Sequence, residues 1–181
     1  MTKQEQRGLA LSARRALSEA ERAAASAAIC KRLLTLPQVQ KAKTVLSYMA
    51  LYDEVDLRAV NEALCSRGVR LVFPVSFRHG RIEAYEPRGW CDGLYGIREP
   101  DPRTSNPVPP EEIDLVLIPC VAFDENRARL GHGAGCYDRY LPRCEDAARI
   151  AVAYECQKLP AIACEEHDRR MDAVVTEEMI Y

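Results

Sequence analysis

A glycine-rich stretch near residue 130 carries the residue types that bind phosphate groups. Gly131, Gly133 and Gly135 stand at alternate positions in RLGHGAGCYDRY, with Arg129 before them and Arg139 after them. Glycine lets the backbone turn its N–H groups toward a ligand, because no Cβ stands in the way. A helix that begins directly after the loop would add unpaired N–H donors and a partial positive charge. The stretch therefore predicts a phosphate-binding loop, although a tight turn where backbone passes close to backbone fits the same glycines.

The segment before this loop indicates where it lies in the fold. IDLVLIP at residues 113–119 is apolar on both faces and ends at a proline, which is typical of a buried strand in a parallel sheet. Ligands of open α/β sheets bind at the carboxyl ends of such strands. We therefore expect the glycine loop to lie at the edge of a parallel sheet.

The rest of the chain alternates between strand and helix patterns. We expect strands at 44–49, 69–74, 81–85, 113–119, 149–154 and 172–176, and helices at 2–17, 19–34, 56–66 and from the glycine loop to Cys144, with a helical turn after Pro37. Residues 86–112 are rich in proline and are expected to be irregular. The alternation predicts one α/β domain over residues 1–181, a three-layer α/β/α fold with a mostly parallel open sheet and helices on both faces.

Composition limits the classes of partner. The chain has 181 residues and a net charge of −2, so no bulk attraction draws it to nucleic acid or to an anionic membrane. Its apolar runs are far shorter than a membrane span, and its N-terminus lacks the apolar core of a secretory signal. The eight cysteines form no CxxC pair and have no histidine at zinc-site spacing, which predicts reduced thiols and a cytoplasmic protein.

Four further polar residues are candidates for chemistry. Lys3 and Arg7 are four residues apart and share one helix face, so they either hold a polyphosphate or form a solvated face. Asp138 beside the phosphate loop is a hard oxygen ligand suited to Mg²⁺, or an acid that offsets a helix dipole. Glu54 follows a strand, where it either faces a ligand or begins a helix.

Several of these stretches together resemble one protein family. IDLVLIPCVAFD followed by RLGHGAGCYDRYL is similar to the signature of the 5-formyltetrahydrofolate cyclo-ligases. KQEQR at the N-terminus, YDEVDL at 52–57 and YGIREP at 95–100 resemble three more segments of that family, in the same order along the chain.

The resemblance implies a ring closure that depends on ATP and Mg²⁺. ATP would phosphorylate the formyl oxygen of 5-formyltetrahydrofolate, N10 would attack the activated carbon, and 5,10-methenyltetrahydrofolate, ADP and phosphate would be released. The implied partners are ATP and a reduced folate, with no nucleic acid and no membrane, and the protein is expected to be a monomer or a weak homo-oligomer. Two alternatives remain open: a folate- or nucleotide-binding paralogue without activity, and an enzyme like the sugar-phosphate isomerases or CoA transferases.

The resemblance also assigns roles to residues of this sequence. It implies ATP binding by Lys3, Arg7, Arg129, Gly131, Gly133, Gly135 and Tyr137, and folate binding by Met49, Glu54, Tyr95, His132 and Cys136. The implied catalytic residues are Glu54, Arg129 and Tyr137, and the implied metal ligands are Asp138 and Asp168.

The sequence departs from the family pattern at two positions near the loop. Cys136 stands where the family has its first tyrosine, and a helix N-terminus is expected to lower the pKa of its thiol. Arg127 stands where the family has glycine in a turn, so we expect the neighbouring Asn126 to adopt the positive φ of that turn.

Overall fold

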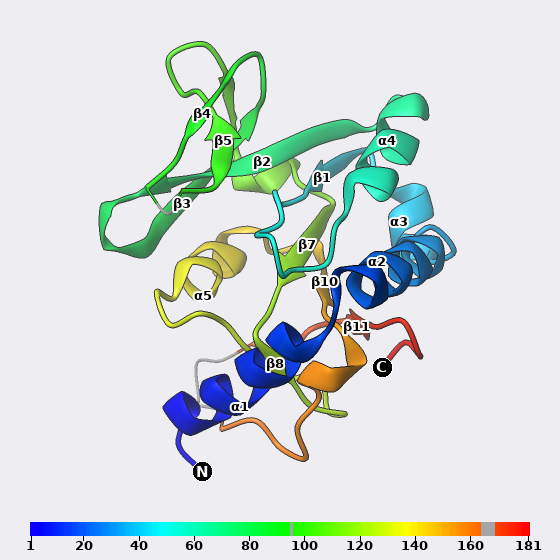
Figure 1. Ribbon diagram of the computed structural model, residues 1–181. Coiled ribbons are helices and arrows are strands. Elements are labelled where there is room, and N and C mark those ends of the chain that lie inside the picture. Colours follow the sequence, from blue (N-terminus) through cyan, green and yellow to red (C-terminus); the bar gives the residue numbers. More distant parts are fainter. Residues whose placement is uncertain (95, 164–168) are drawn as a thin grey trace.

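The central element of the fold is a mixed β-sheet (Figure 1). The computed structural model describes residues 1–94, 96–163 and 169–181. Within them, seven strands form one sheet in the order β11 (Ala173–Val175), β10 (Ala148–Val152), β7 (Leu115–Pro119), β1 (Thr44–Leu46), β2 (Arg70–Phe77), β3 (Arg81–Glu86) and β6 (Asn106–Val108). The first five run parallel, while β3 pairs antiparallel with β2 and with β6. The predicted mostly parallel α/β sheet is confirmed.

Helices cover both faces of the sheet. Neighbouring residues of a strand point to opposite sides, so each strand contributes apolar side chains to both faces. Val45 packs with the residues of α2 (Glu19–Leu33), α3 (Pro37–Lys41) and α4 (Arg58–Ser66), whereas Leu46 packs on the side of α5 (Cys136–Tyr140). Both side chains are fully buried. The three-layer arrangement thus follows from strands that are apolar on both faces.

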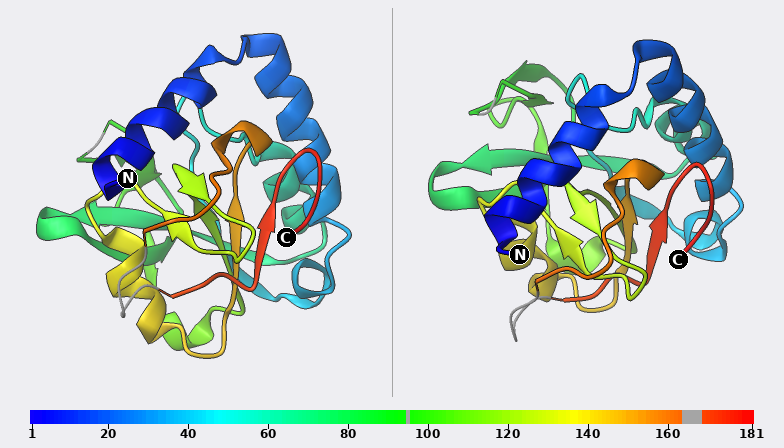
Figure 2. Two further views of the ribbon diagram at one scale, coloured as in Figure 1. Left: turned by 90° about the horizontal axis from the view of Figure 1, so that it is seen from below. Right: turned by 60° about the horizontal axis from the view of Figure 1, so that its bottom comes forward.

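The N-terminal helix α1 (Lys3–Ala16) lies beside a small hairpin of β8 (Ala122–Phe123) and β9 (Arg129–Leu130) (Figure 2). It begins with a capping box, in which Thr2 and Glu5 each satisfy a backbone N–H of the other. Ala10 of α1 is buried against Ala122 and Leu130 of the hairpin. This packing brings the first turns of α1 next to the segment that follows β9, which is the predicted phosphate loop.

Several predicted elements are shorter than expected, among them the helix after the glycine loop and strand β1. The helix after the glycine loop ends at Tyr140 and continues only as a 3-10 turn at Leu141–Arg143. Pro142 lies in that turn, and a proline further into a helix would remove a hydrogen bond and clash with the preceding turn. Strand β1 ends at Leu46 rather than Met49, so Met49 lies in a loop beyond the strand.

The proline-rich region 86–112 is not irregular throughout. It contains β6 and a separate hairpin of β4 (Trp90–Asp92) and β5 (Arg98–Pro100). This hairpin lies against β2 (Figure 1). Trp90 of the hairpin meets Phe73 of β2 edge to face, with ring centroids 5.2 Å apart. The expectation of an irregular connection is therefore wrong for these strands. Each strand is three residues long, which is too short for a periodic sequence pattern to reveal it.

The turn between β8 and β9 corrects a second expectation. Arg127, not Asn126, adopts the left-handed conformation, with φ of 64°. Asp124 fixes the turn, because its Oδ1 accepts hydrogen bonds from the backbone N–H groups of Asn126 and Ala128 at 2.9 and 3.1 Å. Arg127 thus adopts a backbone conformation that favours glycine, although it carries a long side chain.

Candidate functional site

A cavity of about 510 Å³ lies at the carboxyl ends of β1 and β7. It is lined by the first turns of α1, the loop after β1, strand β2, the β5 strand and the glycine loop, residues 131–135. Every predicted site residue within the described part of the chain lines it: Lys3, Arg7, Met49, Glu54, Arg129, Gly131, His132, Gly133, Gly135, Cys136, Tyr137 and Asp138. Tyr95 and Asp168 lie outside the described residues, so their roles stay predictions.

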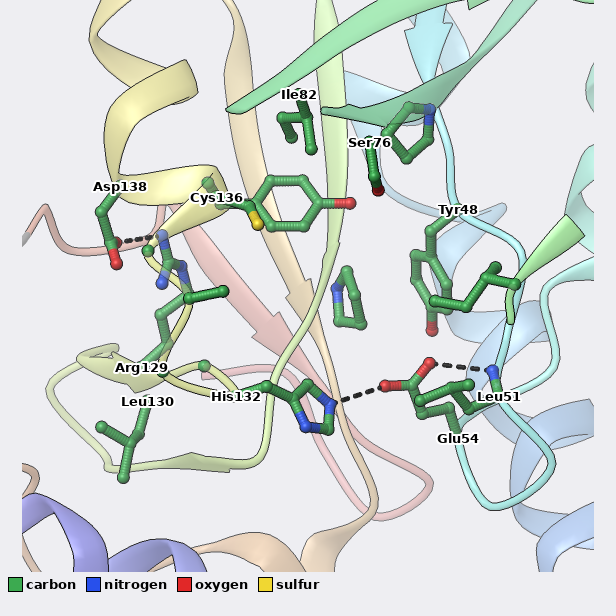
Figure 3. A pocket seen from close by; sticks show the side chains of 18 of the residues that line it. Tyr48, Leu51, Glu54, Ser76, Ile82, Arg129, Leu130, His132, Cys136 and Asp138 are labelled. Carbon is green, nitrogen blue, oxygen red and sulfur yellow. Dashed lines mark hydrogen bonds and ion pairs between the residues drawn. The ribbon is translucent and has the colours of Figure 1, made fainter. Parts of the chain in front are cut away.

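One wall of the cavity is cationic. Arg129 at the end of β9 is nearly buried and donates from Nη2 to Oδ1 of Asp138 at 2.6 Å (Figure 3). The Nε of Arg129 is buried without a hydrogen-bond partner among the described residues. From α1, Arg7 donates from its Nε to the backbone oxygen of Gly131 at 2.8 Å. Two guanidinium groups thus flank the glycine loop, an arrangement suited to a phosphate chain.

Arg139 joins the glycine loop to the turn between β2 and β3. Its guanidinium donates to the backbone oxygens of His79, Gly80 and Ala134. A Cβ on Gly80 would overlap both Arg139 and the Ala134 carbonyl, so glycine is required for this close approach. The loop is therefore held from outside the cavity by a residue of α5.

Glu54 forms a second cluster, on the loop after β1. Its Oε2 accepts the backbone N–H of Leu51 at 3.0 Å, and its Oε1 lies 3.1 Å from Nε2 of His132 (Figure 3). Behind it, the buried Arg14 lies 3.8 Å from the same Oε1 and forms a two-pronged ion pair with Asp53, at 3.0 and 3.2 Å. Glu54 is buried and held in one orientation by these contacts.

Burial raises the pKa values of two groups beside the glycine loop. The pKa of the Tyr137 phenol lies well above its ordinary value because of desolvation, reinforced by the negative charge of Glu54. Tyr137 therefore stays protonated and can donate a hydrogen bond. Burial also raises the pKa of the Cys136 thiol, and the opposing effect of Arg139 is smaller. The expected lowering of the Cys136 pKa is wrong, because α5 is a single short turn and the thiol packs against apolar neighbours.

The described residues supply a limited set of metal ligands. They contain no group of three or more His, Cys, Asp or Glu side chains that could enclose a cation. Asp138 lines the cavity with its side chain 35% exposed, and its Oδ1 is paired with Arg129. Such a site fits an ion like Mg²⁺, which is often held by one or two carboxylates together with substrate phosphates and water.

Sequence reasoning missed several residues of the cavity wall. Tyr48, Ser76, Ile82 and Glu99 line it, and the first three are labelled in Figure 3. Glu99 was visible in the YGIREP segment, but the sequence gives no sign that its strand folds back over β2. Ser76 and Ile82 come from strands that read as ordinary core elements.

The fold and the site define an α/β protein with a glycine-rich loop and two arginines beside a cavity at the carboxyl ends of its parallel strands. A model of the 5-formyltetrahydrofolate cyclo-ligase family matches residues 1–177. The chain belongs to this family.

Curated relatives and solved structures agree with the assignment. The chain is 30% identical over 175 residues to the 5-formyltetrahydrofolate cyclo-ligase of Escherichia coli K12, covering 93% of this chain and 96% of that protein. It is 29% identical over 173 residues to a probable 5-formyltetrahydrofolate cyclo-ligase of Schizosaccharomyces pombe, covering 86% and 85%.

Two solved structures share the fold over nearly their whole length. The 5,10-methenyltetrahydrofolate synthetase of Aquifex aeolicus superposes with a TM-score of 0.85 at 33% identity, covering 99% of this chain and 92% of that one. The synthetase of Mycoplasma pneumoniae gives a TM-score of 0.80 at 28% identity, covering 98% and 99%. Among the residues that the structure describes, no helix is long and apolar enough to cross a membrane.

Proposed function

We propose that this protein converts 5-formyltetrahydrofolate to 5,10-methenyltetrahydrofolate in a reaction that consumes ATP and requires Mg²⁺. The observation that carries the proposal is one cavity in which cations of α1, the glycine loop with Arg129, and the carboxylate of Glu54 all meet. A phosphate donor and an organic acceptor bound there would lie side by side. Phosphoryl transfer asks a protein mainly for such positioning and for charge neutralisation.

The first step is activation of the formyl group. Its oxygen attacks the γ-phosphorus of ATP, the bond to the β,γ-bridging oxygen breaks, and ADP leaves. Lys3, Arg7 and the backbone of Gly131, Gly133 and Gly135 hold the phosphates, while Arg129 and the Tyr137 hydroxyl offset negative charge on the transferred group. Asp138 would hold a Mg²⁺ ion, which would supply further charge neutralisation when bound.

The second step is ring closure. N10 attacks the activated carbon, the C–O bond breaks, and inorganic phosphate leaves. Glu54 accepts the proton that N10 loses, and its contact with His132 offers that proton a path to solvent, since the His132 side chain is 46% exposed. Met49 and Cys136 line the same cavity and would contact the bound folate.

A direct assay tests this function. Protein mixed with ATP, Mg²⁺ and 5-formyltetrahydrofolate should form methenyl product, which is followed by its absorbance, with one ADP released per turnover. Omitting ATP or chelating Mg²⁺ should stop the reaction. Ring closure at the same rate without ATP would contradict the proposal, and binding of both ligands with no turnover would favour the inactive paralogue.

A further inference from the structure

A third carboxylate, Glu99 of β5, lies in the cavity wall without a full set of partners. Glu99 is only 4% exposed, and its Oε2 accepts one hydrogen bond, from the backbone N–H of Ser76 at 2.9 Å. No ion pair and no second hydrogen bond to its carboxyl group occurs among the described residues. A buried carboxylate with a single hydrogen bond is costly unless another donor or cation approaches it.

The fold makes specific room for this carboxylate. Gly93, at the end of the β4–β5 hairpin, has no Cβ, and a Cβ there would overlap the Glu99 carboxyl group. The hairpin turn is closed by a hydrogen bond from the backbone N–H of Gly93 to the oxygen of Ile97 at 2.8 Å. The position of Glu99 is therefore set by the hairpin rather than by chance packing.

Glu99 differs in this respect from Glu54, and also from Asp138, whose Oδ1 is paired with Arg129. Both oxygens of Glu54 have partners, namely the backbone of Leu51 and the ring of His132. Among the described residues Oε1 of Glu99 has no hydrogen-bond partner, so this oxygen retains its full capacity to accept hydrogen bonds. Of the two glutamates, Glu99 is thus the one that is poised to accept bonds from a ligand.

The place of Glu99 in the cavity indicates which part of a ligand it meets. Its partner Ser76 lies beside Ile82, on the side of the cavity opposite Leu130 and His132 (Figure 3). A ligand whose reacting group faces the cationic wall would extend its far edge toward Ser76.

We propose that Glu99 recognises the substrate by accepting hydrogen bonds from a ring edge with adjacent N–H donors, namely the 2-amino-4-oxopyrimidine edge of the reduced pterin. This inference rests on the proposed function for the identity of the ligand. The 2-amino group and N3–H of that ring lie side by side, so they match the two oxygens of a carboxylate much as a guanidinium does. Glu99 is then the residue that selects the pterin, while Glu54 serves the reacting end.

Binding of 5-formyltetrahydrofolate by calorimetry, with no ATP present, tests the inference in the whole protein. Glu99→Gln keeps the size of the side chain but presents an NH₂ group to the donors of the ligand. The Kd for the folate should rise roughly 10- to 100-fold, as for loss of a charged hydrogen bond, whereas the Kd for ATP should change less than about 2-fold. The matched control Asp92→Asn removes an exposed acid from the same hairpin and should leave both affinities unchanged.

A ligand-side measurement keeps the test valid even if the Glu99 variant folds poorly. The analogue with a 2-methyl group in place of the 2-amino group should bind the wild-type protein at least about 10-fold more weakly, and Glu99→Gln should weaken that analogue little further. Equal binding of the two ligands by the wild-type protein overturns the inference, as does an equal loss of ATP and folate affinity in Glu99→Gln. A protein that shows Glu99-dependent binding without turnover refutes the proposed activity and supports the role of Glu99.

Discussion

Oε1 of Glu54 lies 3.1 Å from Nε2 of His132, so two segments far apart in sequence meet across the cavity. One belongs to the loop after β1 and the other to the glycine loop. If the pair carries the proton of N10 away, His132→Ala should lower kcat about 10- to 100-fold while the KM for ATP stays the same. His79→Asn, which changes an exposed histidine outside the cavity, is the control. Unchanged kcat in His132→Ala would show that the contact only shapes the cavity wall.

Arg7 of α1 should act on ATP rather than on folate. The Nε of Arg7 donates a hydrogen bond to the backbone oxygen of Gly131. This bond holds the two Nη groups of Arg7 beside the glycine loop. Arg7→Ala, and likewise Lys3→Ala, should raise the KM for ATP roughly 5- to 100-fold, the range for losing a partly desolvated charge pair. Arg15→Ala on the same helix has a 62% exposed side chain and provides the control. If steady-state titrations give the same KM for ATP in Arg7→Ala as in Arg15→Ala, α1 does not bind the nucleotide.

The ion pair between Arg14 and Asp53 supports the Glu54 loop from behind. Because both side chains are buried, Arg14→Met removes the close partner of Asp53, leaves it only the exposed Arg15 at 3.9 Å, and should lower the free energy of unfolding by about 3–5 kcal/mol. Adding Asp53→Asn should restore part of this loss, because the uncompensated charge is removed. Urea unfolding of the two single variants and the double variant measures the coupling, and strictly additive losses would mean that the pair contributes nothing.

Arg127 is a residue with a side chain in a backbone conformation that favours glycine. Its φ of 64° disfavours any side chain, so Arg127→Gly should be more stable than Arg127→Ala by about 1 kcal/mol. Both variants lose the exposed hydrogen bond from Arg127 to the Asp172 carbonyl, so their difference isolates the backbone effect. Thermal unfolding that ranks the alanine variant above the glycine variant would show that the turn relaxes.

Cys136 should react slowly with alkylating agents near neutral pH. Burial raises the pKa of its thiol, so a smaller fraction is thiolate at a given pH than in a free cysteine, and the thiolate is the reactive form. Mass spectrometry of iodoacetamide-treated protein should find labelling of Cys136 that lags N-acetylcysteine and increases as the pH rises above 9. Bound ATP and a folate analogue should protect it. Labelling at pH 7 as fast as the free thiol, or equal labelling with both ligands bound, places Cys136 elsewhere.

The sequence predicted the sheet and the place of the glycine loop because both depend on local patterns. The buried strand Leu115–Pro119 is apolar on both faces and precedes the glycine loop, so the place of the loop at the sheet edge could be inferred. The clustering of Lys3, Glu54 and Asp138 around that loop was inferred by resemblance, since no local pattern joins them.

What the sequence could not reveal depends on long-range packing. The β4–β5 hairpin folds over β2 and brings Glu99 into the cavity, yet its strands are three residues long and carry no periodic signal. The contact of His132 with Glu54 spans 78 positions, and the raised pKa of Cys136 arises from burial that only the folded structure defines.

The transfer of the formyl oxygen tests the central claim most directly. If ATP activates that oxygen, 5-formyltetrahydrofolate labelled with ¹⁸O in the formyl group should give inorganic phosphate that contains one ¹⁸O per methenyl product, with ADP formed in equal amount. Mass spectrometry of the phosphate after a single turnover measures this. Label that appears in water while the phosphate remains unlabelled would contradict phosphorylation of the formyl group, and with it the proposed mechanism.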